Sequence, residues 1–285
     1  MKLKIINAGF IKVDGGAFFG VVPKILWQRL LPADENNLVP NILRLLLIDD
    51  EQHVILIDTG LGTKLNKKLI RAYSPYGNHA LTEILKQNGY LPEQITDVIL
   101  THLHADHCGG AVHKDQHGAL VPTFPNAHYW VSRLQWEQTL NPNPREKAAF
   151  IPDNYIPLKE AGLLSFIDQD TELYTGIYLK HHFGHTTGLL AVHIHLDDAW
   201  IIYPSDFLPT AYHVYEPYIM SYDICAQKTM EEKEEFFKWI TSVKHCIIFG
   251  HDPNNECGVI YKDKKGHKVK DTCTLEQFLD ELQQS

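Results

Sequence analysis

The chain alternates short apolar runs with longer amphipathic segments, a pattern typical of proteins that combine β-sheets with helices. Residues 42–48 and 53–57 are nearly continuous apolar runs on either side of four polar residues, which predicts a β-hairpin with both faces buried. Further strands are predicted at 2–13, 97–100, 173–180, 189–196, 199–203 and 246–249. Helices are predicted at 64–73, 79–88, 226–240 and 272–284.

Residues 132–162 depart from this pattern, because short helical patches alternate with prolines. No charge run or linker composition marks a boundary on either side. We therefore expect residues 1–285 to form a single α+β domain that carries a helical, proline-rich insertion at about 132–162.

Two details concern the polar faces of these elements. His193 and His195 alternate with apolar residues, which predicts that both lie on the outer face of an amphipathic strand. The glutamates of 231–235 are predicted to form the solvated face of the helix at 226–240.

The run His-Leu-His-Ala-Asp-His at 102–107 follows directly on the predicted strand 97–100. Side chains two apart in extended backbone point the same way, so His102 and His104 converge, and Asp106 and His107 follow as the chain turns. Burying such groups is costly unless they are paired or coordinated, and imidazole is a preferred zinc ligand. The run therefore predicts a metal site, and the alternative is a polar surface loop.

Two further features of the sequence support the prediction of a metal site in this loop. Gly109-Gly110 would permit the tight backbone that the turn needs. Asp58 ends the strand at 53–57, where a carboxylate could orient an imidazole of the metal site from behind. The alternative for Asp58 is a simple turn cap.

Aromatic residues mark two candidate walls of a substrate pocket. Phe18 and Phe19 are predicted either to border the site on a glycine-bounded loop or to belong to a core strand. Tyr212, His213 and Tyr222 lie in an irregular stretch rich in rings. If this stretch folds over the site, His213 or Tyr212 could hydrogen-bond a substrate oxygen that becomes anionic, and the alternative is an ordinary loop histidine. These rings predict an apolar pocket.

Composition and net charge limit the classes of molecule that the protein is expected to bind. The net charge is −9 and there is no basic run, which argues against nucleic acid and anionic membranes as partners. No apolar stretch approaches the ~20 residues that a membrane span requires. The N-terminus lacks a signal-peptide core, and the five cysteines include no C-x-x-C pair. We expect a cytoplasmic protein with a small-molecule substrate, and a homodimer is compatible with the sequence.

The motif His-x-His-x-Asp-His after an apolar strand resembles the metal-binding signature of the metallo-β-lactamase superfamily. Other elements of that pattern follow in order: Asp58-Thr59-Gly60, Gly184-His185-Thr186-Thr187-Gly188, Ser205-Asp206 and Phe249-Gly250-His251-Asp252. The resemblance spans roughly residues 1–260. It implies a four-layer αβ/βα sandwich with metals at one edge of the sheets.

The resemblance also implies a ligand set for two divalent ions. One ion would be held by His102, His104 and His185, the other by Asp106, His107 and His251, with Asp206 bridging both. Zinc is the expected metal, although such ligands also accept manganese, iron or cobalt.

Two such ions can hold a bridging water and lower its pKa far enough to supply hydroxide at neutral pH. Asp106 would shuttle a proton to the leaving group. The expected activity is a dinuclear metal-dependent hydrolase acting on a lactone or a related carboxylic ester. The alternatives are a thioesterase of the glyoxalase II type, a phosphotriesterase, or, in a different class, an iron-dependent oxidoreductase.

One position departs from the lactonase branch that the chain otherwise resembles. Quorum-quenching lactonases carry a tyrosine three residues beyond the bridging aspartate, where this chain has Pro209. Either Tyr212 or Tyr222 takes that role, or the role is absent in this chain.

Overall fold

The computed structural model describes residues 1–284 and divides the chain into two compact units. The first unit comprises residues 1–11 and 42–169. The second comprises residues 12–41 together with the chain from Asp170 onward.

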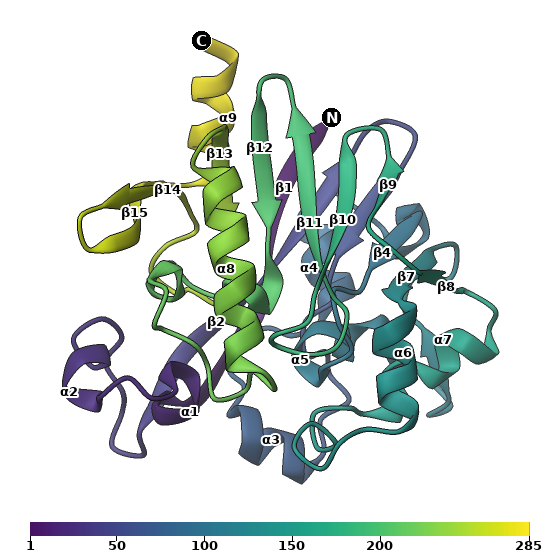
Figure 1. Cartoon of the computed structure of the whole chain (residues 1–285). Helices are drawn as coiled ribbons and strands as arrows, with labels where there is room; N and C mark the ends of the chain where they lie inside the picture. The colour runs from purple at the N-terminus through teal and green to yellow at the C-terminus, as the bar shows by residue number, and fades with distance from the viewer. Residues whose placement is uncertain (285) are drawn as a thin grey trace. The chain divides into compact units, whose positions relative to one another are not determined.

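A six-stranded mixed sheet organises the first unit (Figure 1). The predicted hairpin is present, because β2 and β3 pair antiparallel with Leu46 opposite Ile57. From β3 the sheet continues in parallel through β4, β7 and β8. In sheet order the strands are β1 (Lys2–Asp14), β2 (Leu38–Asp49), β3 (Val54–Ile57), β4 (Asp97–Ile99), β7 (His128–Ser132) and β8 (Leu164–Ile167). The ends of β1 and β2 at residues 12–14 and 38–41 belong to the second unit.

Short helices follow the strands of this unit. The region 132–162 contains two of them with a 3₁₀ turn between, as well as extended connections. A small hairpin, β5 (Val112–Lys114) and β6 (Leu120–Pro122), precedes β7. The helices are α3 (Lys67–Tyr73), α4 (Leu81–Gln87), α5 (Ala105–Cys108), α6 (Arg133–Leu140) and α7 (Ile156–Glu160), with 3₁₀ turns η1 (Pro92–Gln94), η2 (Gly109–Ala111) and η3 (Pro152–Asn154).

The second unit is built on a seven-stranded mixed sheet. All its neighbouring strands pair antiparallel except β12 and β13, which are parallel. In sheet order the strands are β15 (Gly266–Cys273), β14 (Cys257–Asp263), β13 (Lys244–Ile248), β12 (Ala199–Tyr203), β11 (Leu189–Leu196), β10 (Ile177–His182) and β9 (Thr171–Tyr174).

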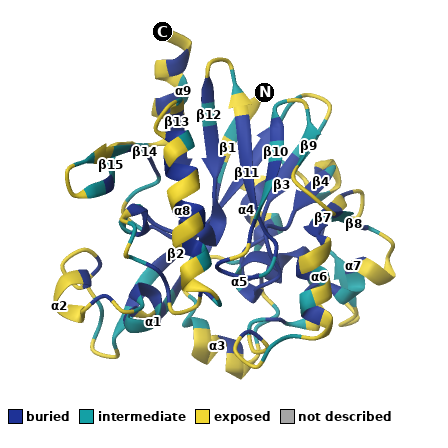
Figure 2. Ribbon diagram, viewed as in Figure 1, coloured by how far each residue is buried: buried dark blue, intermediate teal, exposed yellow. Residues whose placement is uncertain are grey.

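Helix α8 (Ala226–Ile240) packs lengthwise on this sheet (Figure 1). Its Phe236 and Phe237 join Ile202 of β12 and Ile247 of β13 in one buried cluster. Figure 2 shows the resulting division of α8 into a buried and an exposed face. The remaining helices of the unit are α1 (Gly15–Phe19), α2 (Lys24–Trp27) and α9 (Leu275–Gln284), with 3₁₀ turns η4 (Ser205–Phe207) and η5 (Ala211–Val214).

Three sequence predictions about these elements are wrong in detail. Phe18 and Phe19 lie in α1, neither in a loop nor in a strand, because the Asp14 side chain accepts a hydrogen bond from the Ala17 amide and caps a helical turn. His193 and Glu232 were both expected to face solvent, but both are buried. The reason is that α8 covers the face of the sheet that carries His193, and Glu232 lies on the side of α8 that faces this sheet. His195 is exposed, as predicted.

Within residues 1–284, none of the helices combines the length and apolar character that crossing a lipid bilayer demands.

Candidate metal centre

The first donor set lies where β4 ends in the first unit. His102, His104 and His107 are all buried, and Asp106 is partly exposed on the first turn of α5. The metal-binding atoms of His102 lie within 4.8 Å of those of His104 and of those of His107, and Asp106 is equally close to His107. The ring centroids of His102 and His104 are 4.6 Å apart. The structure therefore brings together all four ligand-type residues of the motif.

Asp58 lies beside this set and accepts hydrogen bonds from Thr101 and His107. Its carboxylate accepts from the amide of Thr101 at 2.8 Å, from the Thr101 hydroxyl at 2.9 Å and from Nδ1 of His107 at 2.8 Å. The Thr101 hydroxyl oxygen also lies 3.1 Å from Nδ1 of His102, so it can accept there while donating to Asp58. Both imidazoles then carry their proton on Nδ1, which leaves Nε2 of His102 and His107 as lone-pair donors for a metal.

Close backbone packing holds this arrangement in place. The Thr59 amide donates to the His107 carbonyl at 2.7 Å, and the Gly110 amide donates to the Gly60 carbonyl at 3.1 Å. A Cβ on Gly109 would lie 2.1 Å from the Leu61 carbonyl oxygen, and one on Gly110 would lie 2.2 Å from that of Thr59. The sequence predicted that these glycines permit a tight turn. In the structure they are required because the backbone at 109–110 packs directly against the backbone at 59–61, which leaves no space for a Cβ atom.

A carboxylate that sequence reasoning missed lies beside His104. Glu146 is buried and its Oε1 is 3.7 Å from Nε2 of His104. Its Oε2 accepts a hydrogen bond from the Gln138 amide nitrogen at 3.0 Å. The region 132–162 thus reaches the histidine loop, which no feature of its irregular sequence signalled.

The second donor set lies in the second unit and consists of His185, Asp206 and His251. Nε2 of His185 is 3.2 Å from Oδ2 of Asp206, and Nε2 of His251 is 2.9 Å from Oδ1 of the same carboxylate. These residues follow β10, β12 and β13 respectively. All three strands run in the same direction, so their carboxyl ends meet at one edge of the sheet.

Asp223 orients His185 much as Asp58 orients His107. Its Oδ1 lies 2.9 Å from Nδ1 of His185, and its Oδ2 accepts a hydrogen bond from the Thr229 hydroxyl at 2.8 Å. Nε2 of His185 is thereby turned toward Asp206. The sequence gave no signal for Asp223, since it lies in an irregular stretch far along the chain from its partner.

The first two turns of α8 hold the loop that carries His185. Glu232 accepts hydrogen bonds from the amides of Phe183 at 2.8 Å and Gly184 at 3.3 Å. A Cβ on Gly184 would lie 2.1 Å from Oγ1 of Thr229 and 2.6 Å from its backbone nitrogen. Only glycine fits at that contact, so the loop is seated directly on α8.

The donor chemistry of both sets fits divalent metal ions, because each combines neutral imidazole nitrogens with a carboxylate. A comparison with known proteins decides the family. Residues 45–251 match the Lactamase_B family, the metallo-beta-lactamase superfamily. The chain belongs to the metallo-beta-lactamase superfamily.

Several known proteins resemble the chain at low sequence identity. An N-acyl homoserine lactonase from a Bacillus species is 24% identical over 223 residues, which cover 74% of this chain and 82% of the lactonase. A probable metal-dependent hydrolase from Staphylococcus aureus superposes with a TM-score of 0.84 at 27% identity, covering 96% of this chain and 98% of that one. AidC, a dizinc quorum-quenching lactonase, superposes with a TM-score of 0.77 at 23% identity, covering 96% and 95% of the two chains.

These comparisons confirm the predicted metallo-beta-lactamase fold, in which helices flank two mixed sheets. The protein is a metal-dependent hydrolase of this superfamily, distantly related to the homoserine lactonases.

Four of the five residues predicted to line a substrate pocket meet in the second unit. The ring of His213 lies 4.9 Å from that of Phe18 and stacks on Phe19 at 5.4 Å, and Tyr212 lies 6.4 Å from Phe19. Tyr222 is exposed.

Both ring nitrogens of His213 are used within this cluster. Nε2 donates to the Phe18 carbonyl at 2.9 Å, and Nδ1 accepts from the Thr210 hydroxyl at 2.7 Å. Burial lowers the pKa of His213 to about 4, which fits this neutral tautomer. Through these two hydrogen bonds, the His213 side chain connects η5 to α1.

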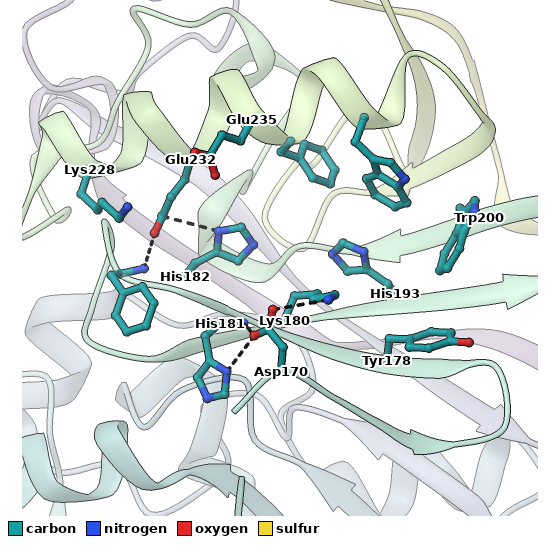
Figure 3. Close-up of a pocket in the computed structure, with 13 residues that line it drawn as sticks. Asp170, Tyr178, Lys180, His181, His182, His193, Trp200, Lys228, Glu232 and Glu235 are labelled. Atoms are coloured by element: carbon teal, nitrogen blue, oxygen red, sulfur yellow. Dashed lines mark hydrogen bonds and ion pairs between the residues drawn. The ribbon is translucent and has the colours of Figure 1, made fainter. Parts of the chain in front are cut away.

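A separate cavity of about 660 Å³ opens between α8 and the sheet of the second unit (Figure 3). Its walls include His182, His193 and Trp200 from the strands and Glu232 and Trp239 from α8. None of the five residues predicted for the substrate pocket lines it. Figure 3 shows Glu232 linked both to His182 and to the backbone that leads to His185.

Proposed function

We propose that the two donor sets together hold two divalent metal ions, most simply zinc, and that Asp206 bridges them. The observation that carries this proposal is the carboxylate of Asp206. Its two oxygens face two different imidazoles, Oδ2 toward His185 and Oδ1 toward His251. A carboxylate that offers one oxygen to each of two ligand groups is suited to link two ions.

The ligand order of the superfamily assigns the remaining positions of this proposed centre. His102, His104 and His185 would hold one ion. Asp106, His107 and His251 would hold the other. The hydrogen bonds that fix Nδ1 of His107 and His185 support the assignment, since they leave Nε2 available in each case.

The chemistry proposed for this centre is hydrolysis. When bound, two divalent ions lower the pKa of a shared water and polarise the carbonyl oxygen of a substrate. Asp106 is partly exposed and lies 3.4 Å from the hydroxyl of Tyr73, so its carboxylate is reachable from solvent and has a polar neighbour. We assign Asp106 the transfer of a proton to the leaving group.

The substrate that we propose is a lactone or a related carboxylic ester. Support comes from the likeness to homoserine lactonases, whose names specify such a substrate. Pro209 replaces the tyrosine that quorum-quenching lactonases carry at that position, which argues for a lactone other than theirs or for another residue in that role. All five cysteines are free thiols, which supports a location in a reducing compartment such as the cytoplasm.

The test combines metal analysis with a substrate panel. Protein purified without added metal is expected to carry two ions per chain and to open γ- and δ-lactones before it cleaves thioesters or phosphotriesters. Asp206→Ala should lose both metal and turnover, while His195→Ala, an exposed histidine of the same unit, should keep both.

Other results would separate the parts of this proposal. Two ions with turnover of phosphotriesters or thioesters alone would overturn the substrate and leave the centre. A single iron with oxidation of the substrate, or an Asp206→Ala variant with full metal content, would overturn the centre itself.

A further inference from the structure

The cavity between α8 and the sheet of the second unit is large enough to hold a small organic molecule. Its volume of about 660 Å³ lies within the range of about 300–1,000 Å³ that is usual for ligand pockets. All the residues that line it belong to the second unit. Within residues 1–284, none of them belongs to a group of side chains close enough together to hold a metal ion. An occupant of this cavity would therefore be bound by the walls themselves.

Aromatic rings form one part of these walls. The ring of Trp200 lies 5.6 Å from that of Tyr178 and 5.3 Å from that of Trp239, which stacks on His193 at 5.2 Å. Tyr178, Trp200 and Trp239 are only partly buried, so part of each side chain remains accessible. Such a row of rings offers an apolar contact to a flat ligand, and the face of an indole attracts cations.

His193 adds a polar atom that the fold leaves unused. The residue is 6% exposed, and its Nε2 is buried without a hydrogen-bond partner among residues 1–284. A buried polar atom in that state is destabilising, so a ligand that hydrogen-bonds to it offsets that cost. Burial lowers the pKa of His193 to about 3, which keeps the ring neutral at pH 7. A neutral ring with its proton on Nδ1 can accept a hydrogen bond from a cation at Nε2.

Two carboxylates bring negative charge to the same cavity. Glu232 and Glu235 lie one turn apart on the same face of α8, and both line the cavity (Figure 3). Glu232 accepts hydrogen bonds from two backbone amides, which orient its carboxylate without neutralising it, and it lies 3.5 Å from Nδ1 of His182. Glu235 is exposed and, across the described chain up to residue 284, makes neither a hydrogen bond nor an ion pair.

The lysines of the walls already have acidic partners. Nζ of Lys180 lies 3.4 Å from a carboxylate oxygen of Asp170. Nζ of Lys228 lies 3.8 Å from that of Glu231, which is not among the residues that line the cavity. The carboxylate of Glu235 is thus left without a counter-ion, so the walls favour a positively charged ligand over an anion.

We propose that this cavity binds an arylalkylammonium ion, in which an aromatic ring is joined to a primary ammonium group. The ring would pack against Trp200 and Trp239. The ammonium would pair with Glu235 and Glu232 and donate a hydrogen bond to Nε2 of His193, which has no other partner within residues 1–284.

The experiment titrates the full-length protein, with its metal as purified, with tryptamine in a calorimeter at pH 7. A ligand of this size in a preformed pocket is expected to bind with a Kd on the order of 1 mM or tighter, at one molecule per chain. Three matched compounds show which parts of the ligand are recognised. 3-Ethylindole lacks the charge, indole-3-propionate reverses it, and propylamine lacks the ring. Each should bind at least about fivefold more weakly than tryptamine.

Substitutions in the walls locate the site. Glu235→Gln removes the unpaired charge and should weaken tryptamine binding about threefold to tenfold. His193→Phe keeps a ring beside Trp239, removes Nε2 and should weaken binding by a similar factor. Glu234→Gln is the matched control, because Glu234 is an exposed glutamate of α8 that does not line the cavity, and this variant should bind tryptamine as the parent does.

Three results would overturn the proposal. One is an absence of saturable tryptamine binding at concentrations about ten times the expected Kd. Another is a matched compound that binds as tightly as tryptamine, since the site would then not recognise both the ring and the positive charge. The third is tryptamine binding that Glu235→Gln or His193→Phe leaves unchanged, which would place the amine elsewhere on this acidic protein. Because Glu235 is exposed, its glutamine variant is expected to fold, so these outcomes can be read directly.

Discussion

Oδ1 of Asp223 lies 2.9 Å from Nδ1 of His185, and this contact turns Nε2 of the imidazole toward Asp206. The pair is buried and is supported in turn by the Thr229 hydroxyl. An aspartate from an irregular stretch thus decides which nitrogen of His185 is available as a ligand.

Replacing Asp223 by asparagine should weaken metal binding about 10- to 100-fold while the chain stays folded, since loss of an orienting partner has effects of that size. Competition of the purified protein with a chelator of known affinity measures the change. Asp198→Asn, on the exposed turn between β11 and β12, is the matched control and should bind metal as the parent does. Unchanged affinity in Asp223→Asn would show that this contact does not position a ligand.

Alanine at Gly184 should destabilise the second unit by about 1–3 kcal/mol, because its Cβ would overlap Thr229. Urea unfolding of the metal-free protein reports this change. Adding Thr229→Ala should not restore stability, since the backbone nitrogen and Cα of residue 229 would still lie 2.6 and 2.7 Å from the new Cβ. Full rescue by the double variant would mean that the clash involves the hydroxyl alone.

Acid should destabilise the protein partly through His193. Burial lowers the pKa of His193 to about 3, and its ring stacks on Trp239 at 5.2 Å. The folded state disfavours the charged ring, so the stability that His193 contributes is complete above the unfolded pKa of about 6.5 and is lost as pH falls toward 3. The free energy of unfolding, measured by urea from pH 7 to pH 4, should therefore fall less steeply in His193→Phe.

His195→Phe is the control for that measurement. It alters an exposed histidine two residues away on the same strand, and its pH profile should follow the parent. Identical profiles for the parent and both variants would contradict the assigned role of His193.

His213→Ala should lower the thermal midpoint by several degrees and disturb the packing of α1, because the ring joins the Phe18 carbonyl to Thr210. Tyr212→Phe keeps the ring and should leave the midpoint nearly unchanged. Calorimetry and turnover of a lactone separate the two roles open to His213. A variant with normal stability and a reduced kcat would show that His213 acts on substrate, which is one of the two alternatives that the sequence left open.

The positions of the ligand-type residues at strand ends were predictable from the sequence, because the apolar pattern of a strand is local. The hairpin of β2 and β3 and helix α8 were predictable for the same reason. Asp223 and Glu146 were not, because each lies in an irregular stretch and acquires its partner only through folding. His193 was misplaced because periodicity identifies a second strand face without saying whether a helix covers it.

Helix α8 has a consequence for engineering this enzyme. The sequence of its first two turns is typical of a solvent-exposed helix. In the structure, however, Thr229 and Glu232 contact the loop that precedes His185. The Lys233 ammonium donates hydrogen bonds to the carbonyls of His213 and Tyr218. In a mutational library that varies these three positions, most variants are expected to be destabilised. Diversity is better placed on the solvent-facing side of the helix, at Glu231, Glu234 and Lys238, where substitution leaves those anchors intact.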